Sequence, residues 1–148
     1  MKSLKNERDQ IEMIRRLESL SPQAQPRWGR LTAAKMICHV ADCLRMALGD
    51  LATRPPRSSA FIRFLLKPLF VFVLPMPRNL PTGRELLSTA PTTFEQDRQA
   101  CADLMRRFSS TPGSGKGPSH QFFGVLTWSE WGALQWRHLD HHLRQFGA

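Results

Sequence analysis

FFGVLTWSEWGALQWRHLDHHLRQFGA, residues 122–148, is the stretch of sequence that decides the fold. Thr127 and Glu130 form a T-x-x-E capping box, in which each side chain bonds the other's free backbone N–H, so a helix is predicted to begin near Trp128. Gly147 is a natural stop. At about 100° per residue, one stripe of this helix collects Trp131, Leu134, Gln135, His138, His142 and Gln145. The two histidines of that stripe are therefore predicted to face inward.

His138 and His142 lie one helical turn apart, close enough for both imidazoles to bind one ion. Two ligands do not complete a site, because a stable metal centre needs at least a third protein ligand. A lone pair of histidines at this spacing is common, and such residues can simply be hydrogen-bonded in a protein core. The spacing by itself therefore leaves both metal binding and a structural role open.

The composition fits one domain, residues 1–148, in which 41% hydrophobic residues supply a core. The net charge of +9 favours an anionic partner, but the cations are dispersed along the chain, as is typical of a solvated surface. Three cysteines without a C-x-x-C pair indicate reduced thiols, and the charged N-terminus lacks the apolar region of a signal peptide. We therefore expect a cytoplasmic protein that binds no specific nucleic acid.

Apolar stripes predict three further long helices, and His39 lies at the edge of the apolar face of the second. The first is expected from about Asn6 to Leu20, and the second from Ala33 to about Gly49 with Thr32 as its cap. The third is expected to begin at a capping box of Thr92 and Glu95 and to end near Ser109. No segment shows the alternation of a β-strand, and STPGSGKGPSH, residues 110–120, is typical of a surface loop. The predicted class is all-α, a four-helix bundle.

Residues 53–91 form a long crossover between the second and third long helices. Its apolar middle is too short and too interrupted by Arg63, Lys67 and Pro68 to span a bilayer, so no transmembrane segment is predicted. It is predicted to form a helix from about Ala60 to Leu66, then a turn or a second short helix. A pocket is expected at one end of the bundle, walled by Trp131 and the crossover. Three roles of the crossover stay open: it covers this pocket, it forms a homodimer contact, or it lies on a membrane surface.

Three blocks of the chain resemble the DinB/YfiT-like metalloenzyme superfamily: RWGRLTAAKMICHVAD (27–42), HQFFGVLTWSEW (120–131) and RHLDHHLRQFG (137–147). The resemblance implies a four-helix bundle with a divalent metal held by three histidines, one on the second helix and two on the last. These positions map to His39, His138 and His142. It also implies a small-molecule substrate, including low-molecular-weight thiols, and a thiol-transfer or hydrolysis reaction.

A site of three neutral imidazoles would suit zinc or nickel, and would leave the ion its full double charge to activate bound water or a bound thiol. The predicted function is thus a metal-dependent enzyme, with no catalytic residue assigned. The alternative is a non-catalytic binding or scaffold protein that the metal only stabilises. Asp42 and Asp140 are candidates to orient the imidazoles. The roles of two further histidines stay open: His141 is an alternative ligand to His142, and His120 is a proton shuttle, an extra ligand or a hydrogen-bonded loop residue.

Overall fold

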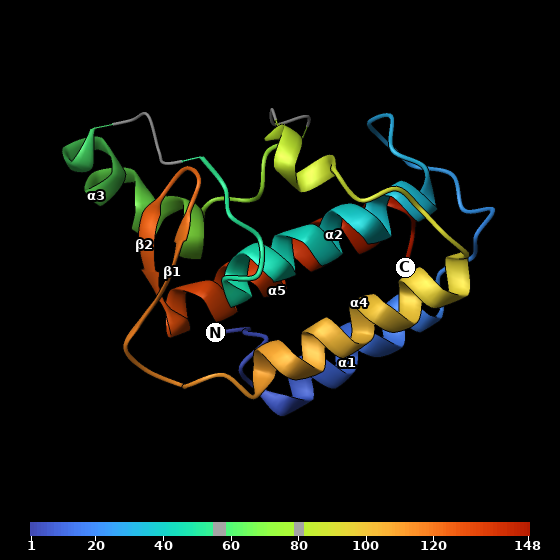
Figure 1. Ribbon diagram of the computed structural model, residues 1–148, viewed down its shortest axis with the longest axis horizontal. Helices are drawn as coiled ribbons and strands as arrows, with labels where there is room; N and C mark the ends of the chain where they lie inside the picture. The colour runs from blue at the N-terminus through green and yellow to red at the C-terminus, as the bar shows by residue number, and fades with distance from the viewer. Residues whose placement is uncertain (55–58, 79–81) are drawn as a thin grey trace.

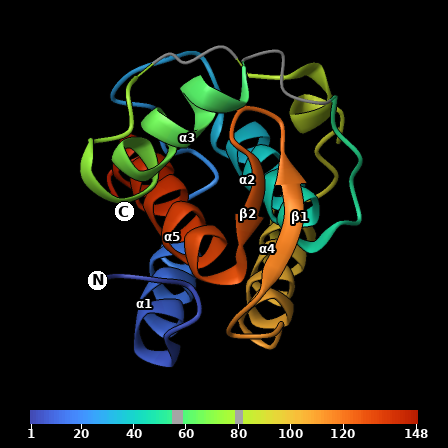
Figure 2. The same cartoon turned by 90° about the vertical axis from the view of Figure 1, so that its left-hand side faces the viewer.

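The computed structural model describes residues 1–54, 59–78 and 82–148. In that part of the chain the four longest helices are α1 (Glu7–Glu18), α2 (Ala33–Leu48), α4 (Phe94–Ser109) and α5 (Trp128–Gln145). Helix α1 packs against α4 and α5, and α2 packs against the same two helices. Figure 2 shows this arrangement nearly end-on, with α1 and α4 on one side and α5 and α2 on the other.

The caps that begin α2 and α5 are those predicted from the sequence. Thr32 accepts a hydrogen bond from the backbone N–H of Lys35, and Thr127 forms the reciprocal capping box with Glu130. The cap of α4 is a correction, since Thr93 and not Thr92 occupies the position before the first helical residue. The neighbouring Thr92 hydroxyl instead donates to a carboxylate in the first turn.

The facing sides of these helices bury an apolar core. Its largest fully buried side chains include Met13, Leu17, Met36, Ile37, Leu44, Met105, Phe108, Trp131, Leu139 and Leu143. Apart from the adjacent pair Met36 and Ile37, they are separated along their helices by three, four, seven or eight positions, which are the separations that line up one face. The stripes that were read from the sequence are therefore the buried faces of the helices.

In its described residues the crossover forms three short helical segments, two of which pack on α2 or α5 while the first packs on the second (Figure 1). They are α3 (Ala60–Pro68), a π-helical turn η1 (Leu69–Val73) and a 3₁₀ turn η2 (Arg84–Leu87). The prediction of a short helix followed by a second one is confirmed, while residues 55–58 and 79–81 of the crossover lie outside the described residues. Segment η1 contacts α5 and η2 contacts α2, so the crossover covers the side of this helix pair.

Two strands correct the all-α prediction. Strand β1 (Lys116–His120) pairs in antiparallel fashion with β2 (Gly124–Thr127), immediately before α5. The expected surface loop is thus partly a strand, because Trp131 of α5 holds it by donating its indole N–H to the Pro118 carbonyl at 2.9 Å. That contact joins residues thirteen positions apart and leaves no alternation in the local sequence.

The chain is therefore mostly helical with one small antiparallel sheet in its described part. The finer assignment, a four-helix bundle, stays a prediction. Within the described ranges, no helix combines the length and the apolar character needed to cross a bilayer.

Candidate metal centre

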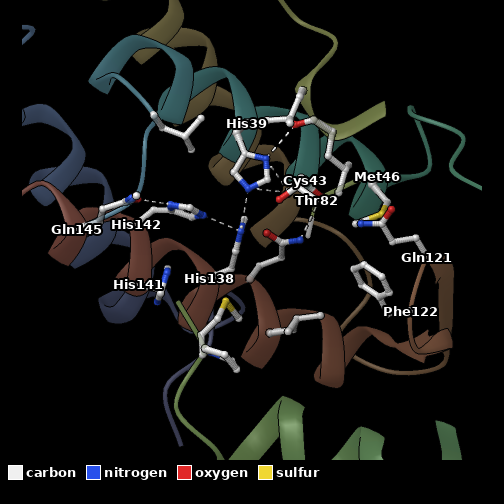
Figure 3. A pocket seen from close by; sticks show the side chains of 18 of the residues that line it. His39, Cys43, Met46, Thr82, Gln121, Phe122, His138, His141, His142 and Gln145 are labelled. Carbon is white, nitrogen blue, oxygen red and sulfur yellow. Dashed lines mark hydrogen bonds between the residues drawn. The ribbon is translucent and has the colours of Figure 1, made fainter. Parts of the chain in front are cut away.

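Helices α2 and α5 bring together three histidines from opposite ends of the chain. His39 Nε2 lies 3.2 Å from His138 Nε2, which in turn lies 3.1 Å from His142 Nε2. Figure 3 shows the three side chains pointing toward one another. Among the described residues, they form a group whose ligand atoms are close enough to hold one metal ion. These are the three residues that the sequence analysis put forward as ligands.

Hydrogen bonds on the outer side of two rings fix their tautomers. His39 Nδ1 lies 2.9 Å from the Leu86 carbonyl, which only accepts, so Nδ1 carries the proton. His142 Nδ1 lies 2.9 Å from Gln145 Oε1. Gln145 presents this oxygen because its Nε2 donates to the Trp28 carbonyl at 2.6 Å. In both neutral rings the lone pair is therefore on Nε2, which faces the third histidine.

The converging lone pairs fit a divalent cation. His138 Nε2 carries at most one proton when the ring is neutral, so it can satisfy only one of the two lone pairs that face it. In a tetrahedral site with metal–nitrogen bonds of about 2.05 Å, neighbouring nitrogens lie about 3.3 Å apart. The separations of 3.2 and 3.1 Å are close to that value. Donor type, tautomer and spacing thus agree with a three-imidazole metal site.

The electrostatic surroundings keep these rings neutral. Burial lowers the pKa of His39 and lowers the pKa of His142 to about 3, and burial together with the neighbouring imidazoles holds the pKa of His138 well below its usual value. Neutral imidazole is the form that binds metal. At neutral pH the cluster is therefore a set of three uncharged nitrogen donors.

The two carboxylates expected to orient the imidazoles do not contact them, and this expectation is wrong. Asp42 is buried but pairs with Arg45 at 2.7 Å, and Asp140 pairs with Arg16 at 2.8 Å. A backbone carbonyl and Gln145 hold the rings instead. Gln145 could have been found, because it lies three residues after His142 on the same helical stripe. The carbonyl leaves no signal, since every residue carries one.

Cys43 lies beside the cluster without joining it. Its Sγ is 3.9 Å from both ring nitrogens of His39. Burial, with a smaller contribution from nearby Asp42, raises the pKa of this thiol, so it stays protonated at neutral pH. A protonated thiol is a poor metal ligand, because the thiolate is the form that binds metal. The interpretation of Cys43 as a small buried residue fits this geometry.

His141 lies outside the cluster even though it neighbours a cluster residue in sequence. Its ring packs edge-on against Trp28, with centroids 5.5 Å apart, and edge-on against His142 at 5.2 Å. The group of potential ligands contains His142 and not His141. The choice between the two adjacent histidines therefore follows the helical stripe.

His120 is held in the turn of the hairpin as a hydrogen-bond acceptor. Its Nδ1 accepts from the backbone N–H groups of Phe122 at 3.0 Å and Phe123 at 3.3 Å. The neutral ring therefore carries its proton on Nε2, and neither nitrogen offers a free lone pair to a metal. Burial lowers the pKa of this imidazole to about 3. Of the three roles considered for His120, that of a hydrogen-bonded loop residue agrees best with these contacts.

The three ligand candidates lie in the wall of a cavity of about 270 Å³, here called the histidine cavity. Its wall is largely apolar and includes Met46, Phe70, Met76, Leu86, Phe123 and Leu134. These residues come from α2, α5, the crossover and the hairpin turn, so the cavity lies along the side of α2 and α5. The expected position at one end of the helices is wrong. Trp131 does not line the cavity, because its ring is buried beneath the hairpin.

Gln135 gives this wall a hydrogen-bond acceptor with no partner. The residue is 2% exposed, and its Nε2 donates to the Cys43 carbonyl at 3.1 Å. That carbonyl only accepts, so the amide cannot be turned around. Its Oε1 has no hydrogen-bond partner within the described part of the chain. Gln135 lies one turn before His138 on α5, so the free acceptor is close to the cluster.

Comparison with known proteins gives a family but no activity. The family model of DUF1569, described as a protein of unknown function, matches residues 3–148. The chain belongs to this family. No curated protein and no solved structure matches the chain. For this member of DUF1569, the geometry of the site is therefore the basis for any assignment of function.

Membership in DUF1569 corrects the resemblance to the DinB/YfiT-like superfamily, which is wrong, since the matching model is that of a distinct family. The blocks that carried the resemblance are short, and two histidines one turn apart recur on many helices that present two ligands to one ion. Such a motif reports local geometry and not ancestry. The thiol chemistry that rested on the resemblance loses its support, whereas the convergence of the histidines is a property of the structure itself.

Proposed function

We propose that the chain binds a divalent metal ion through His39, His138 and His142 and uses it to transform a small organic molecule in the histidine cavity. One observation carries the proposal: three imidazole Nε2 atoms converge at 3.1 and 3.2 Å, and two of the rings are held in the tautomer that turns the lone pair inward. Zinc and nickel suit this nitrogen set.

The arrangement supports a reactive site rather than a closed structural one. Structural zinc sites are usually surrounded by four protein ligands, whereas catalytic sites keep a position for water or substrate. Here three candidate ligands lie in the wall of a cavity, the nearby thiol is held protonated by burial, and the nearby carboxylates pair with arginines. Because the three ligands are neutral, a bound ion would keep its full charge and could supply Lewis-acid chemistry, including a lower pKa for bound water. A hydrolytic reaction is the chemistry that this site supports best.

Two polar groups in the cavity wall would orient the bound molecule. Gln135 offers an acceptor through its unpartnered Oε1, and His120 offers a donor through the proton on Nε2. The remaining wall is mainly apolar, so most of the ligand would be held by burial of its own apolar surface. The proposed substrate is therefore a small, largely apolar molecule.

The metal content of protein purified without an affinity tag tests the site directly. We expect wild type to carry about one equivalent of a divalent ion per chain, as measured by elemental mass spectrometry. His39→Ala and His142→Ala should each lose it, because two imidazoles hold an ion far less well than three. His141→Ala is the matched control, since it removes the adjacent histidine of the same helix and should leave the metal content unchanged.

The proposal fails if folded wild type, after incubation with excess zinc and then with excess nickel, retains neither ion. It also fails if His141→Ala loses the metal while His142→Ala keeps it. If metal binds but chelation abolishes folding and no hydrolysis of ester, amide or phosphoester substrates is found, the metal stabilises the fold without catalysis.

A further inference from the structure

A second hollow, of about 360 Å³, adjoins the histidine cavity. It lies between α5 and the chain segments that carry Trp28 and residues 73–78. Trp28, Met76 and His141 line both spaces, so the two lie side by side. We call this second space the basic hollow, and its polar wall consists chiefly of Trp28, Arg78, Trp136, Arg137, Asp140 and Arg144.

Three residues of this wall carry a buried N–H that lacks an acceptor. They are the indole Nε1 groups of Trp28 and Trp136 and the Nε of Arg137, none of which has a hydrogen-bond partner in the described part of the chain. The other guanidinium nitrogens of Arg137 donate to the carbonyls of Phe72 and Leu74, which hold the group in place. Buried N–H groups are nearly always paired in folded proteins, so three unpaired ones on residues that line one hollow favour an acceptor bound nearby.

The charges of the wall favour an anion as that acceptor. Arg78 lies over the ring of Trp28, 4.2 Å from its centroid, and has no acidic partner among the described residues. The hollow also contains Arg137 and Arg144. Its acidic lining residue is Asp140, which already pairs with Arg16 at 2.8 Å and with Arg144 at 3.6 Å. Water would satisfy the N–H groups, whereas an anion would also pair with the cations of the wall.

We propose that the basic hollow binds the carboxylate or phosphate group of the small organic molecule whose apolar part occupies the histidine cavity. The two spaces divide the ligand's chemistry between them: guanidinium and indole N–H donors for the anionic oxygens, and a largely apolar wall for the rest. The link to the histidine cavity rests on the proposed function, whereas the anion site stands on its own contacts. The substrate class is therefore an aryl or alkyl organic acid or phosphate monoester.

Three probes that share a phenyl ring test the anion site: phenylacetate, phenyl phosphate and the neutral phenylacetamide. Binding to the protein as purified is followed by calorimetry and by tryptophan fluorescence, since two indoles line the hollow. We expect at least one anion to bind about tenfold or more tightly than the amide, the range expected for a charged hydrogen bond. The comparison of the two anions distinguishes a carboxylate site from a phosphate site.

Arg78→Gln removes the unpaired cation from an exposed position and should weaken binding of the anion about tenfold while leaving the amide unaffected. Arg84→Gln, an equal change of charge at an exposed residue of η2 outside the hollow, is the matched control. Trp136→Phe keeps an aromatic ring but removes one N–H donor, and it should also weaken binding of the anion. Equal binding of anion and amide, or equal losses in Arg78→Gln and Arg84→Gln, would overturn the inference.

His142→Ala separates this inference from the proposed function, because it removes a metal ligand that does not line the basic hollow. We expect the anion to bind this variant still. If binding is lost in His142→Ala and unaffected by Arg78→Gln, the anion binds the metal itself, and the anion site is wrong while the metal site stands. If wild type holds no metal but Arg78→Gln still weakens the anion, the proposed function fails and the anion site stands.

Discussion

One side-chain amide connects the histidine cluster to the segment that joins α1 and α2. Gln145 donates to the Trp28 carbonyl and accepts from His142, so the orientation of the amide sets the tautomer of the imidazole. Such partners of a metal ligand fix both ring orientation and ligand basicity. At the scale of the residue, the site thus depends on a group that never needs to touch the ion.

Gln145→Leu is expected to weaken metal binding about 10- to 100-fold, because the imidazole loses the acceptor that keeps its Nε2 lone pair turned inward. Gln145→Glu keeps an acceptor for the ring and should retain most of the affinity. Competition with a chromophoric chelator measures both. Gln99→Leu, an exposed glutamine of α4, is the control, and a loss of affinity there equal to that of Gln145→Leu would contradict the prediction.

At the scale of the element, the hairpin is defined by how closely it approaches α5. A Cβ at Gly117 would lie 2.9 Å from Trp131 Cδ1 and 3.3 Å from the Leu126 carbonyl, so only glycine lets β1 pack this tightly. The indole then donates to the next carbonyl in the strand. The same element carries His120 and its neighbours into the wall of the histidine cavity.

Gly117→Ala is expected to lower the free energy of unfolding by about 1–3 kcal/mol, since Trp131 is fully buried and cannot move aside freely. Gly113→Ala is the matched control in the preceding loop, where an added Cβ would meet no atom within 4 Å. Urea unfolding of the two variants tests this. A loss as large in Gly113→Ala as in Gly117→Ala would show that the close approach to the indole is not the cause.

At the scale of the whole molecule, burial of neutral histidines makes stability depend on pH. Burial lowers the pKa of His120 to about 3, and protonation would also place a new N–H against the two backbone donors that its Nδ1 accepts from. An unfolded histidine has a pKa of about 6.5. Below that pH the unfolded chain takes up a proton that the folded chain does not, so stability falls as the pH drops from about 6.5 toward 3.

We expect His120 to contribute about 2 kcal/mol of this loss between pH 7.5 and pH 5. His120→Asn keeps a side-chain acceptor for the two N–H groups but does not titrate in this range. The difference in unfolding free energy between the two pH values should therefore be smaller in the variant, as measured with urea. Since every other histidine is shared by both proteins, parallel pH dependence of the two would refute the assignment.

Beyond its core, the molecule exposes apolar side chains on the crossover, among them Phe61 at 73%, Leu65 at 62% and Val73 at 67%. The sequence analysis left this segment as a cover, a homodimer contact or a membrane-surface segment. Its lining of the histidine cavity agrees with the first of these roles. The homodimer stays a prediction, as does the absence of specific nucleic-acid binding.

The sequence by itself determined the long helices and the histidine stripe, because both are local. Caps such as Thr32 and Thr127 and the spacing of His138 and His142 act within one or two helical turns, where 100° per residue fixes which side chains share a face. The stripe even included Gln145, the partner of the second of these histidines.

Only the tertiary structure decided which residues from distant parts of the chain contact the helices and the histidine stripe. The approach of Trp131 makes a strand of residues 116–120, the Leu86 carbonyl fixes the tautomer of His39, and the packing of α2 on α5 places that ring 3.2 Å from His138. The basic hollow likewise joins Trp28 to residues of α5 more than a hundred positions away. Such contacts join residues far apart in the chain, and no periodicity encodes them, because they depend on how whole elements pack.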